Sequence, residues 1–262
     1  MKNFKQTNLD DNILKAVTEM GFEKPTSVQA KTIPHLLNSN TDLIATAQTG
    51  TGKTAAFGLP SIHLTDLKNR DTSTLVLCPT RELCIQIAKD LTKYSKYVDG
   101  LNILAVYGGS DIRGQIKALN KGVHIVIGTP GRTKDLIKRN KLKIGSIARI
   151  VLDEADEMLN RGFKDQIYDI FLNACRSSCD TFRYPDLELT FRVDKAKTAP
   201  FLQSHHSITH RGNPKTVRKM KIFFLLLMIS RSYATESALS NLGFSMNYTA
   251  FIDDITSNKI KR

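Results

Sequence analysis

The sequence predicts a doubly wound α/β fold, in which helices flank a parallel β-sheet. Between residues 42 and 154, short apolar runs rich in β-branched residues recur, and amphipathic stretches separate them. Runs that do not alternate between apolar and polar residues are typical of strands buried on both faces of a parallel sheet. The polar motifs of this region follow the runs, which is where such folds bind ligands.

Five strands and four helices are expected in this region. The strands are expected at Asp42–Ala47, Thr74–Cys78, Ile103–Tyr107, His124–Gly128 and Arg149–Asp153. The helices are expected at Lys53–Leu64, Arg81–Tyr94, Asp111–Lys121 and Pro130–Lys138. Because β and α units alternate, right-handed crossovers should join the strands. The five loops that follow the strands should then converge on one rim of the sheet.

The loop after the first strand fits the A/G-x-x-x-x-G-K-[ST] pattern of a phosphate-binding loop. Its residues are Ala47, Gln48, Thr49, Gly50, Thr51, Gly52, Lys53 and Thr54. Glycines let successive backbone N–H groups point at phosphate oxygens, the lysine neutralises the β- and γ-phosphates, and the Thr54 hydroxyl can ligate Mg²⁺. A chance Gly/Thr-rich turn is the alternative, but the expected strand before the loop and helix after it favour phosphate binding.

Two acidic residues, Asp153 and Glu154, end the fifth strand. One carboxylate can hold a metal ion while the next orients or deprotonates a water molecule. Acids that merely cap the following helix are the alternative. Together with the phosphate-binding loop, the pair predicts a site for a nucleoside triphosphate.

Residues 1 to about 167 resemble the first RecA-like domain of a DEAD-box RNA helicase. Six motifs in the family's order carry the resemblance: Phe4 with Gly21–Gln29, Ala47–Thr54, Pro79–Leu83, Gly108-Gly109, Thr129–Arg132 and the tetrad Asp153–Asp156. The resemblance implies a RecA-like P-loop domain that uses ATP and Mg²⁺.

The resemblance also implies roles for individual residues of the nucleotide site. Asp153 would be an indirect Mg²⁺ ligand, Glu154 would position and activate water, and Lys53 would hold the phosphates. Asp156 would couple to a Ser-Ala-Thr motif further along the chain.

The segment from Gly21 to Gln29 resembles the family's adenine-reading Q motif. The Gln29 amide offers a donor and an acceptor for the N6/N7 edge of adenine, and Phe22 offers a flat face for stacking. An ordinary surface amide and a core aromatic are the respective alternatives.

The resemblance further implies that three other loops contact the sugar-phosphate backbone of single-stranded RNA without reading its bases. Their residues are Pro79, Thr80, Arg81, Gly108, Gly109, Thr129, Pro130, Gly131 and Arg132. Arginines and backbone amides at helix N-termini suit phosphate recognition, whereas the alternative for single charges is a solvated surface.

Composition agrees with these expectations. The net charge of +13 suggests a polyanionic partner. No secretory signal pattern opens the chain, and the longest apolar run, Ile222–Ile229, is too short to span a bilayer. The four cysteines show no disulfide framework, which favours a reducing compartment. We therefore expect a cytoplasmic monomer without membrane contact, whose partners are RNA and other RNA-processing proteins.

The resemblance stops after Ile167, and residues 168–262 form an atypical tail. We expect neither the family's Ser-Ala-Thr strand nor its second helicase domain there. Composition shifts at the same place, because 13 of the 15 glycines lie in residues 1–169. Unless the tail supplies a substitute for this strand, the sheet would have a central gap and residues 1–167 would be marginally stable.

Three interpretations of the tail stay open: a frameshift or recombination product, a lineage-specific extension, and a small metal site formed by Cys175, Cys179, His206 and His210. The run Ile222–Ile229 would be either a buried strand that replaces the missing one or an aggregation-prone segment.

The sequence thus predicts an ATP- and RNA-binding domain of a DEAD-box helicase, truncated and unable to unwind RNA alone. An arginine finger is worth ~10³–10⁵ in rate, and the family supplies it from the second domain. The alternative function is a non-catalytic remnant that binds RNA or a partner protein.

Overall fold

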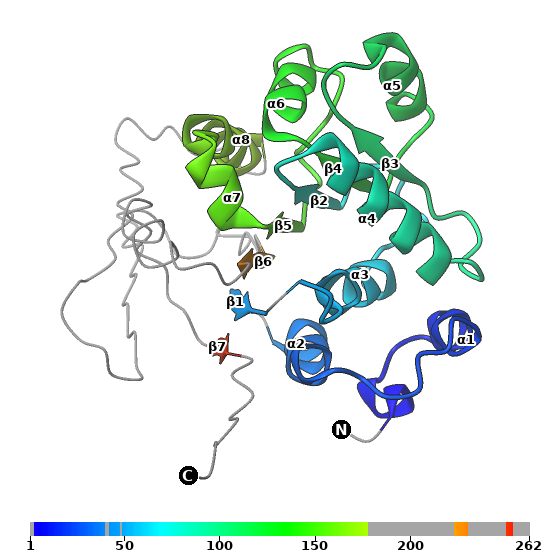
Figure 1. The fold of residues 1–262 in the computed structure, drawn as a ribbon. Helices are drawn as coiled ribbons and strands as arrows, with labels where there is room; N and C mark the ends of the chain where they lie inside the picture. The colour runs from blue at the N-terminus through cyan, green and yellow to red at the C-terminus, as the bar shows by residue number, and fades with distance from the viewer. Residues whose placement is uncertain (1–2, 40–41, 48, 178–222, 230–249, 254–262) are drawn as a thin grey trace, which may run out of the picture.

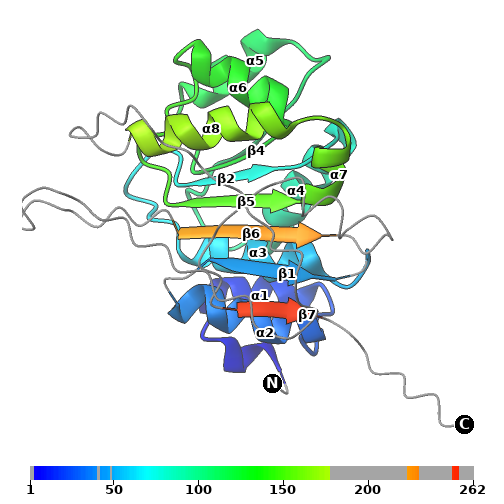
Figure 2. The ribbon, with the colours of Figure 1, turned by 90° about the vertical axis from the view of Figure 1, so that its left-hand side faces the viewer.

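The computed structural model of the chain describes residues 3–39, 42–47, 49–177, 223–229 and 250–253. Within them, seven strands form one parallel sheet in the order β3-β4-β2-β5-β6-β1-β7 (Figure 2). The strands are β1 (Leu43–Thr46), β2 (Thr74–Leu77), β3 (Ile103–Val106), β4 (Ile125–Gly128), β5 (Arg149–Asp153), β6 (Phe223–Ile229) and β7 (Ala250–Asp253). The parallel sheet that the sequence predicts is therefore confirmed.

A short 3₁₀ turn and eight α-helices surround this sheet in the described part of the chain (Figure 1). They are η1 (Phe4–Thr7), α1 (Asp11–Glu19), α2 (Ser27–Asn38), α3 (Lys53–His63), α4 (Arg81–Tyr94), α5 (Ile112–Leu119), α6 (Pro130–Lys138), α7 (Ala155–Asn160) and α8 (Lys164–Ser177). Among these helices, none has the length and apolarity needed to cross a lipid bilayer.

All five strands and four helices expected between residues 42 and 154 are present, with ends that differ by at most two residues. Local chemistry sets the ends. The Thr80 hydroxyl accepts a hydrogen bond from the Leu83 N–H at 3.2 Å and so begins α4. Asp111, expected inside α5, instead caps it by accepting from the Arg113 N–H at 3.0 Å.

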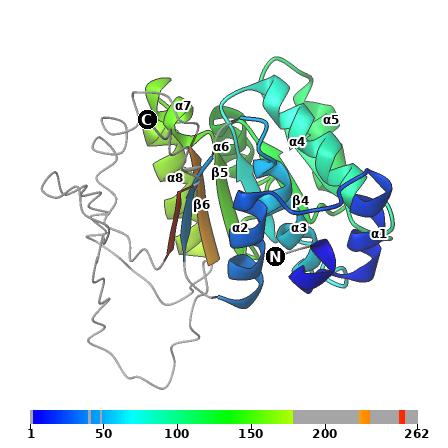
Figure 3. The same cartoon turned by 60° about the horizontal axis from the view of Figure 1, so that its bottom comes forward.

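Two hydrophobic layers hold the helices to the sheet. Apolar residues of α1 to α4 pack with Ala45, Val76 and Ile127 on one face. Residues of α5 to α8 pack with Leu75, Val126 and neighbouring strand residues on the other. Figure 3 shows α2, α3 and α4 together on one side of the strands. The doubly wound arrangement follows, because helices cover both faces of the sheet, and β2, β4 and β5 are buried along their whole length.

The tail supplies a strand at the centre of the sheet, so the gap expected in the absence of a substitute strand is not present. Strand β6 lies between β1 and β5, with Leu226 opposite both Leu43 and Val151. The sequence predicts for Ile222–Ile229 either a substitute for the missing strand or an aggregation-prone segment. The structure supports the first interpretation, because Phe223–Ile229 forms β6. A second tail strand, β7, pairs with β1 on its other side. The proposed metal ligands Cys179, His206 and His210 lie outside the described residues.

The central position of β6 makes its backbone a test of the fold. We expect Leu227→Pro to lower the free energy of unfolding by at least ~2 kcal/mol, because proline removes a ladder N–H and leaves a carbonyl unpaired. Leu227→Val keeps that N–H and is the control. Urea unfolding followed by circular dichroism measures both. Equal stability of Leu227→Pro and the unaltered chain would contradict the central placement of β6.

Candidate functional site

The loop from Ala47 to Thr54 connects β1 to the first turn of α3, as its pattern predicts. Gly52 precedes the helix with a left-handed φ of 85°. Lys53 is the first helical residue, so the N–H groups at the start of α3 have no partner within the helix. Thr49 and Gly50 are exposed, and Thr51 and Thr54 are half-buried. Gln48 lies outside the described residues.

Lys53 and Asp153 bring two buried charged groups to this loop. Their side chains are 8% and 3% exposed, and neither the Lys53 Nζ nor the Asp153 Oδ1 has a hydrogen-bond partner within the described structure. Burial raises the pKa of Asp153 to about 7, although the charge of Lys53 opposes this shift. Buried polar atoms without partners are costly, so the pair suits a ligand that carries both negative charge and a cation.

Glu154 follows Asp153 in an unusual backbone conformation. Its φ of 53° and ψ of 49° lie in the left-handed region, which costs about 1–3 kcal/mol for a residue with a side chain. It stands at the N-cap of α7, but its side chain makes no capping hydrogen bond. Glu154 therefore does not cap α7 through its side chain. Its carboxylate is half-buried and can interact with a ligand or water. Asp156 is buried in the first turn of α7.

Gln29 joins the N-terminal region to the same loop. Its side chain is 3% exposed, which excludes the surface-amide alternative. The Oε1 accepts from the Thr26 N–H at 3.0 Å and the Nε2 donates to the Gly52 carbonyl at 3.1 Å. One Nε2 hydrogen and one lone pair of Oε1 are not used by these bonds. Adenine recognition through them stays a prediction.

Phe22 lies in a small aromatic cluster. Its ring centroid is 6.0 Å from that of Phe4 and 6.1 Å from that of Tyr94. The half-buried ring packs against the core on the α1–α4 side of the sheet. These contacts are those expected if Phe22 is an aromatic residue of the core. Stacking of Phe22 on adenine stays a prediction.

The three loops expected to contact RNA follow β2, β3 and β4, which are neighbours in the sheet. Arg81 is exposed at the start of α4, and its guanidinium carbon lies 5.0 Å from the centroid of the Tyr107 ring. Gly109 has a left-handed φ of 74°. The other members are Pro79 and Pro130, both buried, Thr80 and Thr129, both half-buried, and Gly108 and Gly131, both exposed.

A buried amide that sequence reasoning missed ties two of these loops together. Gln115, 8% exposed, accepts from the Arg132 Nη1 at 2.9 Å. Its Nε2 donates to the Ser110 Oγ at 2.6 Å and to the Tyr107 carbonyl at 3.2 Å. Arg132 also donates to the Ser110 carbonyl at 3.3 Å. The sequence signal is a lone glutamine among apolar residues on the inward face of α5.

The sheet order divides the rim into two halves. The loops expected to bind a nucleotide follow β1 and β5, which flank β6, and the three loops expected to contact RNA follow β3, β4 and β2. In the described part of the chain, no group of three or more His, Cys, Asp or Glu residues could hold a metal ion unaided. Mg²⁺ commonly takes one or two carboxylates together with nucleotide phosphates and water, and Asp153 with Thr54 provides such a partial set.

Residues 26–181 match the model of the DEAD/DEAH box helicase family. The chain is 54% identical over 170 residues to the ATP-dependent RNA helicase CshA of Listeria monocytogenes, a match that covers 65% of this chain and 32% of that protein. It is 49% identical over 167 residues to the DEAD-box ATP-dependent RNA helicase CshA of Bacillus cereus, covering 64% and 31%. The chain thus spans about a third of the length of these curated relatives.

Solved structures share the fold. A DEAD box protein from Methanococcus jannaschii has a TM-score of 0.70 at 36% identity, covering 95% of this chain and 55% of that one. Dbp5 of Saccharomyces cerevisiae, solved with RNA and ADP BeF3, has a TM-score of 0.68 at 23% identity, covering 97% and 52%. The structural match includes far more of this chain than the sequence match does.

The contact between Gln29 and Gly52 can be tested by two alanines. A Cβ at Gly52 would lie 2.2 Å from the Gln29 Nε2, whereas a Cβ at Gly50 meets nothing within 4 Å, although both glycines have positive φ. We expect each substitution to cost ~1–2 kcal/mol for its backbone conformation. Gly52→Ala should cost at least ~1 kcal/mol more, because the buried hydrogen bond is lost. Urea unfolding measures the difference, and equal costs would show that the contact contributes nothing.

Proposed function

Because the chain belongs to the DEAD/DEAH box helicase family, we propose that its described domain binds ATP with Mg²⁺ and single-stranded RNA at neighbouring halves of one rim. The observation that carries this proposal is the pair of buried, unpartnered atoms at the nucleotide half, the Lys53 Nζ and the Asp153 Oδ1. The phosphates of a bound nucleoside triphosphate would provide a partner for the Lys53 Nζ, and the metal ion with its water would provide one for the Asp153 Oδ1.

The phosphate chain of ATP would lie in the loop of residues 47–54. The free N–H groups at the start of α3 and the Lys53 ammonium would neutralise its oxygens. Gln29 supports this arrangement, because its bond to the Gly52 carbonyl fixes the end of the loop. Its remaining donor and acceptor would face the adenine edge, with Phe22 near the base.

Mg²⁺ would be held by the Thr54 hydroxyl and, through water, by Asp153. When bound, it neutralises phosphate charge that develops during phosphoryl transfer. Glu154 would orient the attacking water and accept its proton, since it directly follows the end of β5 and its carboxylate makes no capping bond.

The RNA half would bind phosphates and sugars rather than bases. Arg81 and Arg132 supply charge, and the exposed loop at Gly108 and Gly109 lets a backbone approach closely. Gln115 fixes Arg132 relative to the loop after β3. Sequence-independent binding is expected, because the charged side chains and backbone groups of these loops suit phosphates and sugars, which carry no sequence information.

Strand separation is not assigned to this chain, whose match spans about a third of the length of the curated relatives. We propose a cytoplasmic monomer that binds RNA and docks with RNA-processing proteins.

Lys53→Ala tests the nucleotide half. Loss of a charged phosphate contact is worth ~1.5–3 kcal/mol, so affinity for a fluorescent ATP analogue with Mg²⁺ should fall about 10- to 150-fold. Lys68→Ala, at an exposed site away from the loop, is the control. Fluorescence titration measures both. Equal affinity of the Lys53→Ala variant and the unaltered chain would reject ATP binding here and favour a non-catalytic RNA- or partner-binding domain.

Gln115→Ala tests the RNA half. The substitution leaves the Arg132 guanidinium without its side-chain acceptor, so affinity for a fluorescein-labelled ten-nucleotide uridine RNA should fall at least ~5-fold. Binding of the ATP analogue should be unchanged. Gln86→Ala, an exposed glutamine on α4, is the matched control. An unchanged RNA affinity would show that Gln115 does not position the RNA loops, and equal losses for both ligands would indicate a general loss of structure.

A further inference from the structure

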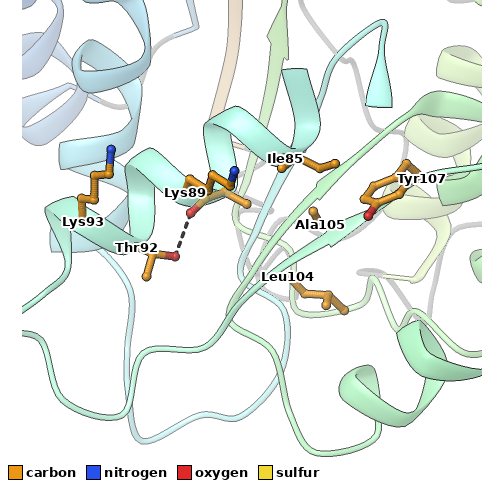
Figure 4. Close-up of a pocket in the computed structure, with 8 residues that line it drawn as sticks. Ile85, Lys89, Thr92, Lys93, Leu104, Ala105 and Tyr107 are labelled. Atoms are coloured by element: carbon orange, nitrogen blue, oxygen red, sulfur yellow. Dashed lines mark hydrogen bonds between the residues drawn. The ribbon is translucent and has the colours of Figure 1, made fainter. Parts of the chain in front are cut away.

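A surface groove lies between α4 and the edge strand β3, outside the nucleotide half of the rim. Its volume is about 480 Å³. In Figure 4, Lys89 and Lys93 extend from successive turns of α4, while Leu104, Ala105 and Tyr107 follow the strand. The remaining lining residues are Ile85, Ala88 and Thr92. None of these residues belongs to the family motifs in the sequence.

The groove runs along the open edge of the sheet. Successive side chains of a strand point to opposite faces, yet both Leu104 and Ala105 line the groove. It therefore follows the strand's edge rather than one face. Among the described strands, β3 pairs only with β4, which makes it the end of the sheet.

The backbone of β3 presents hydrogen-bonding groups to this edge. The carbonyls of Asn102 and Val106 accept from the Ile125 and Thr129 N–H groups of the β4 side at 3.2 and 3.1 Å. Alternate residues direct their backbone groups to opposite sides of a strand, so the N–H and C=O of Ile103 and Ala105 point away from β4. The edge ends at Tyr107, whose carbonyl is bonded to Gln115.

The helix side of the groove combines an apolar floor with a basic rim. Ile85 and Ala88 are half-buried, and Lys89 is exposed without an ion pair in the described part of the chain. Lys93 is 61% exposed and lies 3.9 Å from Asp90, a distance typical of a weak surface pair. Both ammonium groups are thus available to a negatively charged partner.

We propose that this groove binds an extended peptide segment of a partner protein, which adds to β3 as a further strand. Its backbone would pair with Ile103 and Ala105. The row of its side chains that faces α4 would place apolar residues over Ile85 and Ala88 and acidic residues beside Lys89 and Lys93. The backbone of RNA has no repeating N–H donors for the exposed carbonyls, so a peptide fits this edge better. The inference does not depend on ATP or RNA binding.

The test uses a fluorescein-labelled ten-residue peptide in which every second residue is threonine and the others are three valines followed by two glutamates, so that valine and glutamate share one face. The peptide is titrated onto the full chain by fluorescence anisotropy. We expect saturable binding that falls at least 10-fold in Lys89→Glu/Lys93→Glu. The matched control, Lys141→Glu/Lys143→Glu, reverses two exposed lysines elsewhere and should bind normally. Absence of saturable binding, or equal losses in both double variants, would overturn the proposal.

Two further measurements use the unaltered chain, so their results do not depend on whether a variant folds. The peptide is N-methylated at either of its two alternating sets of amides; one set faces β3 and the other faces solvent, so only one version should lose binding. Hydrogen exchange should slow at the Ile103 and Ala105 amides in complex with the peptide. Loss of binding in both versions or in neither, or unchanged exchange, would exclude strand addition. Slowed exchange with uridine RNA but not with peptide would identify a nucleic-acid groove instead.

Discussion

The pairing of β6 with both β1 and β5 is the interaction on which the rest of the structure depends. These two strands carry the loop of residues 47–54 and the acidic pair Asp153 and Glu154, and β6 holds them one strand apart. In the register, Ile229 stands opposite Thr46 and Met228 opposite Asp153. The carboxyl ends of all three strands are therefore level. This pairing also joins β1 and β7 to the rest of the sheet.

At the half of the rim proposed to bind a nucleotide, the features that suit a ligand lower the stability of the ligand-free chain. Lys53 and Asp153 keep buried atoms without partners, and Glu154 adopts a left-handed backbone. Each feature costs free energy in the ligand-free chain. The surrounding structure tolerates them because β1 and β5 are buried and Gln29 anchors the end of the loop through Gly52. Several destabilising features within one small region are typical of a site that binds a charged ligand.

The other half of the rim is held by side-chain hydrogen bonds rather than by buried charge. Gln115 links Arg132 to the loop after β3, and Arg81 covers the ring of Tyr107. Tyr107 also borders the groove along the sheet edge. One residue thus contacts the surface proposed for RNA and the surface proposed for a peptide, so a segment bound along β3 would lie directly beside the RNA loops.

The sequence by itself determined the α/β class, nine element positions between residues 42 and 154, and the loops that form the rim. These follow from local periodicity and from turn and capping residues such as Thr80 and Pro130, which act within a few positions. Only the tertiary structure decided that Phe223–Ile229 fills the centre of the sheet, because strand pairing across about 70 residues leaves no local signal. It also decided that Gln29 reaches Gly52 and that Gln115 reaches Arg132, since helix packing brings these distant polar groups within hydrogen-bonding distance.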